Sequence, residues 1–168
     1  TMFAYEHANI CPDIICVGKA LTGGYMSMAA TITSKNVADG IYGGLKMPFM
    51  HGPTFMANPL SCTAASASIS LLLASNFKEK IPQIEGWFKQ DMEKFKKLPG
   101  VKDVRILGAI AVLEMQHKIP LRTWQKQLVN KGVWLRPYRN MIYIIPPYII
   151  NRMELSKITE AVFSIIKS

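Results

Sequence analysis

The chain has 168 residues, of which 49% are hydrophobic and 18% are charged. This composition is typical of a globular protein with one substantial core or two small ones, and it excludes a disordered tail. The formal net charge of +9 raises the question of an acidic partner, although net charge identifies neither a fold nor a function. The basic residues are scattered and form no stripe with stacking aromatics, so we do not expect nucleic-acid binding.

Other features of the composition bear on location and cofactors. No run approaches the roughly 18 apolar residues of a membrane span, so no membrane partner is expected. Three cysteines without a C-x-x-C pair, and three widely spaced histidines, predict neither a disulfide framework nor a metal site and suit the cytoplasm. The chain begins with Thr1 rather than Met, and Thr1–His7 has no basic segment before an apolar run. We therefore expect no secretory signal and a chain cut from a longer one.

The first part of the chain is expected to begin with two strands. Ile14–Val17 is a short apolar run that ends at Gly18, as in a buried strand, and Met28–Thr33 indicates another. Ser34 is suited to cap a short helix that continues through Ile41. Glycines at 40, 43 and 44 end that helix and lead into a loop through Pro48 to Pro53.

Asn58-Pro59 marks the start of a second helix, because Asn caps and Pro at the first helical position loses no useful N–H. The following stretch, Leu60–Leu73, is rich in Ala and Ser and carries no charge. Such a helix is predicted to be buried on more than one side.

The second part reads as a compact mixture of helices and strands. An amphipathic helix follows Asn76, and its aromatic stripe is interpreted as a core face. The further elements expected, in chain order, are β-structure at Val101–Met115 with a turn or bulge at Gly108, a helix at Leu121–Asn130, strands at Val133–Arg136 and Met141–Ile145, and a closing helix at Glu154–Ile166. The order is α/β throughout and predicts two parts with a boundary near residues 75 to 100.

Lys19 is the first candidate for chemistry, since it follows an apolar strand and precedes Thr22-Gly23-Gly24. An amine nucleophile must be partly deprotonated, and desolvation at the end of a buried strand favours this. Glycines let a cofactor approach the backbone closely. The alternative is an ordinary solvated lysine at a strand end.

Two further clusters carry suitable groups. Thr54 lies in the run Met50–Phe55, just before the helix start at Asn58, where a hydroxyl and free N–H groups favour a phosphate. The alternative is a loop whose Pro and Gly residues only shape a turn. Arg136 lies in an apolar segment before Pro137, where bidentate binding of a carboxylate is strong. A surface arginine on an edge strand is the alternative there.

These clusters, in this order, resemble the class III, fold-type I aminotransferases. The resemblance is carried by Pro12–Gly24, Phe49–Met56 and Gly132–Pro137, and extends through Ile142-Tyr143 and Pro146–Ile150. It implies an α/β fold in which residues 1–75 end a large, mostly parallel-sheet domain that binds pyridoxal 5'-phosphate. Residues 76–168 form an interdomain helix and the small C-terminal α/β domain.

The resemblance also implies roles for individual residues. Lys19 holds pyridoxal 5'-phosphate as a Schiff base and then moves a proton, while the cofactor serves as electron sink. Pro53 and Thr54 contact the cofactor phosphate of the neighbouring subunit of a homodimer. The residues implied to contact the substrate are Gly52, which borders it, Arg136, which holds its carboxylate, and Tyr143, which lines the pocket.

The strings His51–Met56 and Pro146–Ile150 resemble the members of this family that act in biotin biosynthesis. In those enzymes S-adenosylmethionine donates an amino group to 8-amino-7-oxononanoate and yields 7,8-diaminononanoate. Two alternatives remain open. One is a class III enzyme for ornithine or another ω-amino acid, and the other is a noncatalytic basic module that binds nucleic acid or a protein.

The family site also requires an acidic partner for the pyridine nitrogen, a tyrosine beside the ring and a Gly-Ser phosphate cup. All three lie upstream of the residues that match here. We therefore expect the 168-residue chain by itself to lack useful aminotransferase activity.

Overall fold

The computed structural model describes residues 1–43 and 49–167. The chain divides into two compact units, Thr1–Asn76 and Phe77–Ser168. The division falls one residue from the expected boundary at 75/76, and the place of each unit in a larger enzyme stays a prediction. The part of the predicted loop at 44–48 lies outside the described residues.

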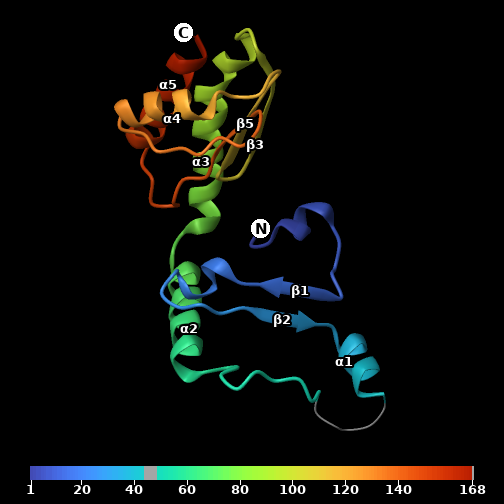
Figure 1. The fold of residues 1–168 in the computed structure, drawn as a ribbon. Helices are drawn as coiled ribbons and strands as arrows, with labels where there is room; N and C mark the ends of the chain where they lie inside the picture. The colour runs from blue at the N-terminus through green and yellow to red at the C-terminus, as the bar shows by residue number, and fades with distance from the viewer. Residues whose placement is uncertain (44–48, 168) are drawn as a thin grey trace. The chain divides into compact units, whose positions relative to one another are not determined.

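The described residues of the first unit form two short strands, two 3-10 turns and two helices, which Figure 1 shows in the ribbon. In chain order they are η1 (Ala4–Ala8), β1 (Ile14–Val17), η2 (Lys19–Thr22), β2 (Ala30–Thr33), α1 (Lys35–Tyr42) and α2 (Pro59–Ala74). The predicted caps are confirmed: Ser34 Oγ accepts from Val37 N, and Asn58 Oδ1 accepts from Ser61 N at 2.9 Å. Both elements therefore begin where the local sequence indicates.

The two strands of this unit are antiparallel, with Ile14 opposite Thr33 and Val17 opposite Ala30. The mostly parallel sheet that the resemblance implied is not what this pair shows. The connection from Gly18 to Ala29 contains only the short η2 turn. The crossover between parallel strands usually contains a full helix, and this connection contains no such helix, so the chain reverses between β1 and β2.

Two burial predictions for the first unit are wrong. Ile14 in β1 is 54% exposed, and Leu71 in α2 is 74% exposed. Within α2, only Ser61 and Ala65 are buried. The composition of α2 is apolar, as predicted, but the principal element of the described unit that packs on α2 is the small η2 turn. A helix of this length keeps most of its surface uncovered when its partner is one turn.

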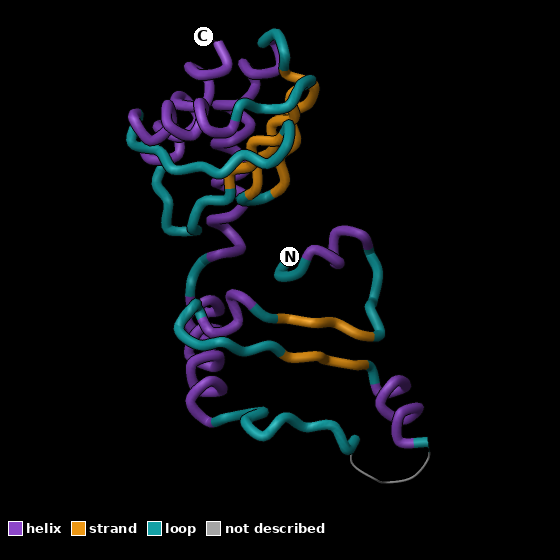
Figure 2. The backbone as a smooth tube through the Cα atoms, in the orientation of Figure 1, coloured by secondary structure: helices purple, strands orange, loops and turns teal. Residues whose placement is uncertain are grey.

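The second unit is a sheet covered by helices (Figure 2). Its elements are α3 (Phe77–Met92), η3 (Glu93–Lys97), β3 (Val101–Leu107), β4 (Ile110–Met115), α4 (Leu121–Asn130), β5 (Met141–Ile144) and α5 (Arg152–Lys167). The strands form an antiparallel sheet in the order β3-β4-β5. The predicted turn at Gly108 is confirmed, with φ of 55°.

The core of the second unit joins the sheet to its helices. Alternate residues of β4 are buried, among them Leu113, as the two-residue period of a strand requires. Phe88 of α3, Ile142 of β5 and Leu155 of α5 share this core and are at most 1% exposed. The aromatic stripe of α3 is thus confirmed as a core face, and the unit has the two-layer form of a small α/β domain.

The segment Val133–Arg136 is not a strand, contrary to the prediction. Val133 N donates to Leu128 O at 3.0 Å, and Gly132 N donates to Val129 O, which closes the end of α4. Pro137 has no N–H for a ladder. Only an isolated bridge between Tyr138 and Met141 precedes β5. The amide that a strand would use is therefore already committed to the helix end.

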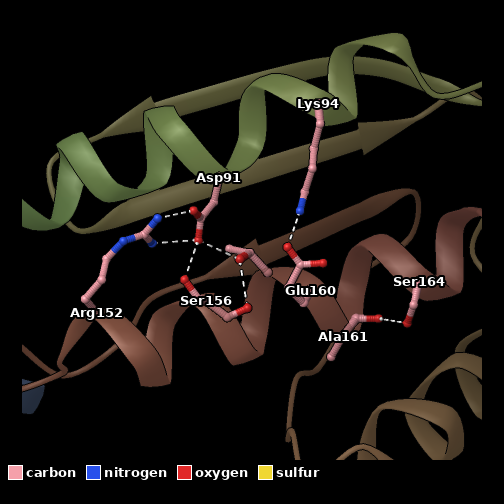
Figure 3. A network of polar contacts seen from close by, with 8 residues as sticks. Asp91, Lys94, Arg152, Ser156, Glu160, Ala161 and Ser164 are labelled. Atoms are coloured by element: carbon pink, nitrogen blue, oxygen red, sulfur yellow. Dashed lines mark hydrogen bonds and ion pairs between the residues drawn. The ribbon is translucent and has the colours of Figure 1, made fainter.

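A polar network joins α3 to α5 (Figure 3). Arg152 donates to both carboxylate oxygens of Asp91, and Thr159 Oγ1 donates to Asp91 Oδ2 at 2.8 Å. Ser156 adds a third donor. Burial raises the pKa of Asp91, but the donors outweigh it and hold that pKa below its usual value.

No single helix among residues 1–43 and 49–167 is long and apolar enough to cross a membrane. One bent pair, Pro59–Ala74 with Phe77–Lys97, passes such a test by length and composition alone.

Candidate active site

Lys19 lies at the first position of η2, directly after β1. Its φ of 45° places it in the left-handed region, which is uncommon for a residue with a side chain. Such strain costs about 1 to 3 kcal/mol and often occurs at functional sites. The side chain is exposed rather than desolvated, so the described residues do not supply the burial that the sequence suggested. Lys19 is therefore held in an unusual backbone conformation with an accessible amine.

The turn after Lys19 is stabilised by the buried side chain of Thr22, which is 1% exposed. Thr22 Oγ1 donates to Met26 O and accepts from Met26 N, so one hydroxyl closes the Gly23-Gly24 turn. Ser68 Oγ of α2 also donates to Ala20 O at 3.5 Å. The position of Lys19 therefore depends on a buried hydroxyl and on a helix remote in sequence.

Lys19 lines an open hollow of about 640 Å³ together with residues 24–29. A hollow of this size accommodates a small aromatic cofactor, since ligand sites commonly measure 300 to 1,000 Å³. An exposed amine at its edge is the group that a carbonyl cofactor needs. The described residues thus fit the lysine side of a pyridoxal phosphate site.

Thr54 and Pro53 line a second hollow, of about 580 Å³. Its other lining residues are Ser27, Met28, Ala29, Phe55, Met56, Ala57 and Asn58. Thr54 is exposed, and its hydroxyl makes no hydrogen bond with the described residues. A free hydroxyl in a concave site fits a phosphate oxygen. Gly52 is also exposed but does not line this hollow.

The remaining candidates, Arg136 and Tyr143, belong to the second unit. Arg136 is exposed and precedes the buried Pro137. Tyr143 is half-buried on β5, directly opposite Val112 of β4. Their predicted roles toward substrate stay predictions.

Sequence reasoning missed the segment Ser27–Ala29, which lines both hollows of the first unit. The segment carries no charge, motif or turn residue that could have indicated a site. It also missed Thr22, although a threonine before two glycines is a common turn-stabilising residue. Among residues 1–43 and 49–167, no group of three or more His, Cys, Asp or Glu could hold a metal.

A sequence model of the family "Aminotransferase class-III" matches residues 1–166. This chain belongs to the class-III aminotransferase family. Its membership favours an enzyme over the basic binding module that the net charge left open.

Two curated relatives within this class-III family bear the same name, adenosylmethionine-8-amino-7-oxononanoate aminotransferase. The one from Buchnera aphidicola subsp. Acyrthosiphon pisum is 46% identical over 96% of this chain, and the one from Mycobacterium leprae is 43% identical over 98%. The chain spans 38% of the length of each. The class-III chain therefore corresponds to a minor part of these relatives.

Solved structures agree with the class-III fold. The chain is similar to adenosylmethionine-8-amino-7-oxononanoate aminotransferase from Methanocaldococcus jannaschii, with a TM-score of 0.79 and 32% identity, over 94% of this chain and 39% of that one. It is also similar to acetylornithine aminotransferase from Elizabethkingia anophelis, with a TM-score of 0.83 and 26% identity, over 99% of this chain and 41% of that one.

Proposed function

We propose that this chain supplies the lysine side of a pyridoxal phosphate-dependent aminotransferase of biotin biosynthesis. The reaction proposed is amino transfer from S-adenosylmethionine to 8-amino-7-oxononanoate, which yields 7,8-diaminononanoate. Identities of 46% and 43% to relatives with that name support this substrate pair. The observation that carries the proposal is Lys19, an accessible amine on a strained backbone beside a hollow in a class-III chain.

When bound, pyridoxal 5'-phosphate supplies an electron sink for the bond broken at the substrate carbon. Lys19 would hold that cofactor through its Nζ, and the same amine would move the proton at the substrate carbon. Thr54, beside Pro53, would donate a hydrogen bond to the phosphate of the neighbouring subunit's cofactor. Arg136 would hold the carboxylate of the oxo-acid substrate, and the resemblance implies a substrate contact for Gly52 and another for Tyr143.

We also propose a homodimer in the cytoplasm. Both rest on indirect support: the resemblance assigns Thr54 to the neighbouring subunit's cofactor, and all three cysteines are free. Light scattering of the purified protein tests the dimer. A mass equal to one chain at all concentrations would contradict it.

Covalent trapping tests the role of Lys19. The 168-residue chain is mixed with pyridoxal 5'-phosphate, reduced with sodium borohydride, digested and analysed by mass spectrometry. The cofactor mass is expected mainly on the peptide that contains Lys19. Lys19→Arg should abolish that label, while Lys35→Arg, a change at another exposed lysine, should leave it intact. Equal labelling of many lysines would contradict the assignment.

Turnover tests the substrates. The chain alone is expected to show no useful transamination, and robust turnover without any added polypeptide would contradict that expectation. A protein of the relatives' full length that includes this chain should use S-adenosylmethionine in preference to ornithine, lysine or 4-aminobutyrate. Preference for ornithine would instead favour the alternative of a class III enzyme for ornithine or another ω-amino acid.

Substitution of the arginine tests the carboxylate role in that longer protein. Arg136→Ala should raise KM for 8-amino-7-oxononanoate by about 10-fold to 100-fold, because a hydrogen-bonded charge pair is lost. Arg122→Ala, at an exposed arginine on α4, serves as the control. Equal kinetics for the two variants would remove Arg136 from the site.

A further inference from the structure

The two hollows of the first unit have a common wall. Ser27, Met28 and Ala29 line the hollow of Lys19 and also the hollow of Thr54. Any group bound in either hollow therefore lies against this segment. Met28 and Ala29 present only apolar side chains, so Ser27 supplies the side-chain hydroxyl of the wall.

The Thr54 hollow has three polar side chains in its lining, those of Ser27, Thr54 and Asn58. Asn58 is mostly committed, since its Oδ1 accepts from Ser61 N and one of the two N–H groups of its Nδ2 donates to Phe55 O at 3.4 Å. The hydroxyls of Ser27 and Thr54 make no hydrogen bond with the residues that the structure describes. These two hydroxyls, together with the second N–H of Asn58 Nδ2, are therefore the side-chain donors that this lining leaves available.

A phosphate monoester presents three terminal oxygens, and each accepts strong hydrogen bonds. One hydroxyl donates a single hydrogen, so Thr54 alone satisfies a small part of that demand. A second hydroxyl in the same hollow meets more of it. The chemistry that matches two free hydroxyls and a concave surface is an anion with several oxygens.

The position of Ser27 is constrained by its neighbour. Met26 exchanges two hydrogen bonds with the buried hydroxyl of Thr22, one through its N–H and one through its carbonyl. Ser27 follows directly, so its backbone starts from a residue whose main chain is hydrogen-bonded to a buried hydroxyl. A donor held in this way loses little conformational freedom when it binds.

We propose that Ser27 is a second hydroxyl ligand, together with Thr54, for a phosphate group bound in the Thr54 hollow. This inference rests on the proposed function, because it concerns the phosphate that Thr54 is proposed to contact. It adds a binding residue from the loop after Lys19. Through Ser27 the loop that carries the reactive lysine also contacts the phosphate proposed to belong to the neighbouring subunit's cofactor.

Inorganic phosphate is the probe for the test. The ¹⁵N-labelled 168-residue chain is titrated with phosphate, and with chloride at equal ionic strength, while its amide signals are followed by NMR. The signals of Ser27 and Thr54 should shift with one common dissociation constant in phosphate alone. Ser27→Ala and Thr54→Ala should each weaken that binding by about 3-fold to 10-fold. Ser70→Ala, at an exposed serine of α2 outside both hollows, should leave it unchanged.

Each other outcome overturns the proposal in an identifiable way. If Thr54→Ala weakens phosphate binding and Ser27→Ala does not, Ser27 is no ligand and the proposed role of Thr54 stands. If neither change matters, or if the unsubstituted chain shows no saturable shift, the phosphate role of both hydroxyls is wrong. The covalent label on Lys19 separates these failures from failure of the proposed function, since it does not depend on Ser27.

Discussion

Four residues other than glycine have a left-handed backbone in the described part of the chain, at positions 9, 19, 57 and 139. Lys19 is the proposed reactive amine, Ala57 lines the Thr54 hollow, and Arg139 lies three residues after Arg136. Three of the four thus lie at or beside the three clusters that the sequence singled out. Because such conformations persist only where the surroundings impose them, they support those clusters independently of residue type.

At the residue scale, Glu114 offers a test of the charges on the sheet. Lys102, and then Arg105, donate to its carboxylate and lower its pKa to about 2. Because this pKa is lowered in the folded state, the ionised Glu114 stabilises the fold at pH values above the ordinary pKa of 4.5. That stabilisation is lost as the pH falls toward about 2. Lys102→Met should raise the pKa of Glu114, as measured by NMR titration of its carboxyl carbon. Lys118→Met, at another exposed lysine, should leave the pKa of Glu114 unchanged. The same pKa of Glu114 in both variants would contradict the role of Lys102 in lowering it.

The Asp91 network provides a second prediction at this scale. Asp91→Ala leaves the buried hydroxyl of Thr159 and the guanidinium of Arg152 without their shared acceptor. We expect the free energy of unfolding to fall by about 2 kcal/mol, measured by urea denaturation. Glu93→Ala, which removes an exposed ion pair with Lys96, should cost about 0.5 kcal/mol or less. Similar losses for the two variants would show that the network adds nothing beyond a surface pair.

At the scale of elements, the hairpin between β3 and β4 turns at Gly108. Its φ is 55°, its N–H donates to Glu85 Oε2 at 2.8 Å, and an added Cβ would lie 3.0 Å from Ile81 Cγ2. Gly108→Ala should therefore lower the free energy of unfolding by about 1 to 2 kcal/mol. Gly86→Ala within α3 meets no atom within 4 Å and should raise it by about 0.5 to 1 kcal/mol. Urea denaturation measures both, and equal effects would refute the role of the left-handed backbone.

Helix α2 shows how far an element can be understood from its own residues. Asn58 and Pro59 predicted its start, because capping is a local interaction between neighbours in sequence. Its burial was predicted incorrectly, since burial depends on what packs against the helix. Leu60, Leu71 and Leu73 are all more than 60% exposed, although their composition is that of an interior helix.

At the scale of the whole molecule, the two units differ in how much they bury. The buried residues described in the first unit are Thr22, Ser61 and Ala65, whereas the second has a continuous apolar core that includes Phe88 and Leu113. Amides of α3 and β4 should therefore exchange with deuterium far more slowly than those of β1 and α2, as measured by mass spectrometry. Equal protection in the two units would contradict this.

A matched pair of substitutions checks the same prediction. Leu113→Ala removes a fully buried side chain and should reduce the protection of the second unit by about 2 to 5 kcal/mol. Leu73→Ala, at a side chain that is 62% exposed, should change little. A loss of protection caused by Leu73→Ala would reveal a packing role for α2.

The sequence by itself determined the properties that depend on residues close to one another in the chain. The caps at Ser34 and Asn58, the turn at Gly108 and the helix end at Gly132 follow from backbone requirements within a few residues. The candidates Lys19, Thr54 and Arg136 were also found in this way, from residue type and local context.

Only the tertiary structure decided which faces are covered and which residues meet. The exposure of β1 and α2 depends on how little of the described chain packs against them. The bond from Arg152 to Asp91 depends on a partner that is distant in the chain. The wall formed by Ser27–Ala29 joins two hollows whose other residues lie up to about thirty positions away. Such contacts arise from packing free energy summed over many residues, so a local pattern cannot encode them.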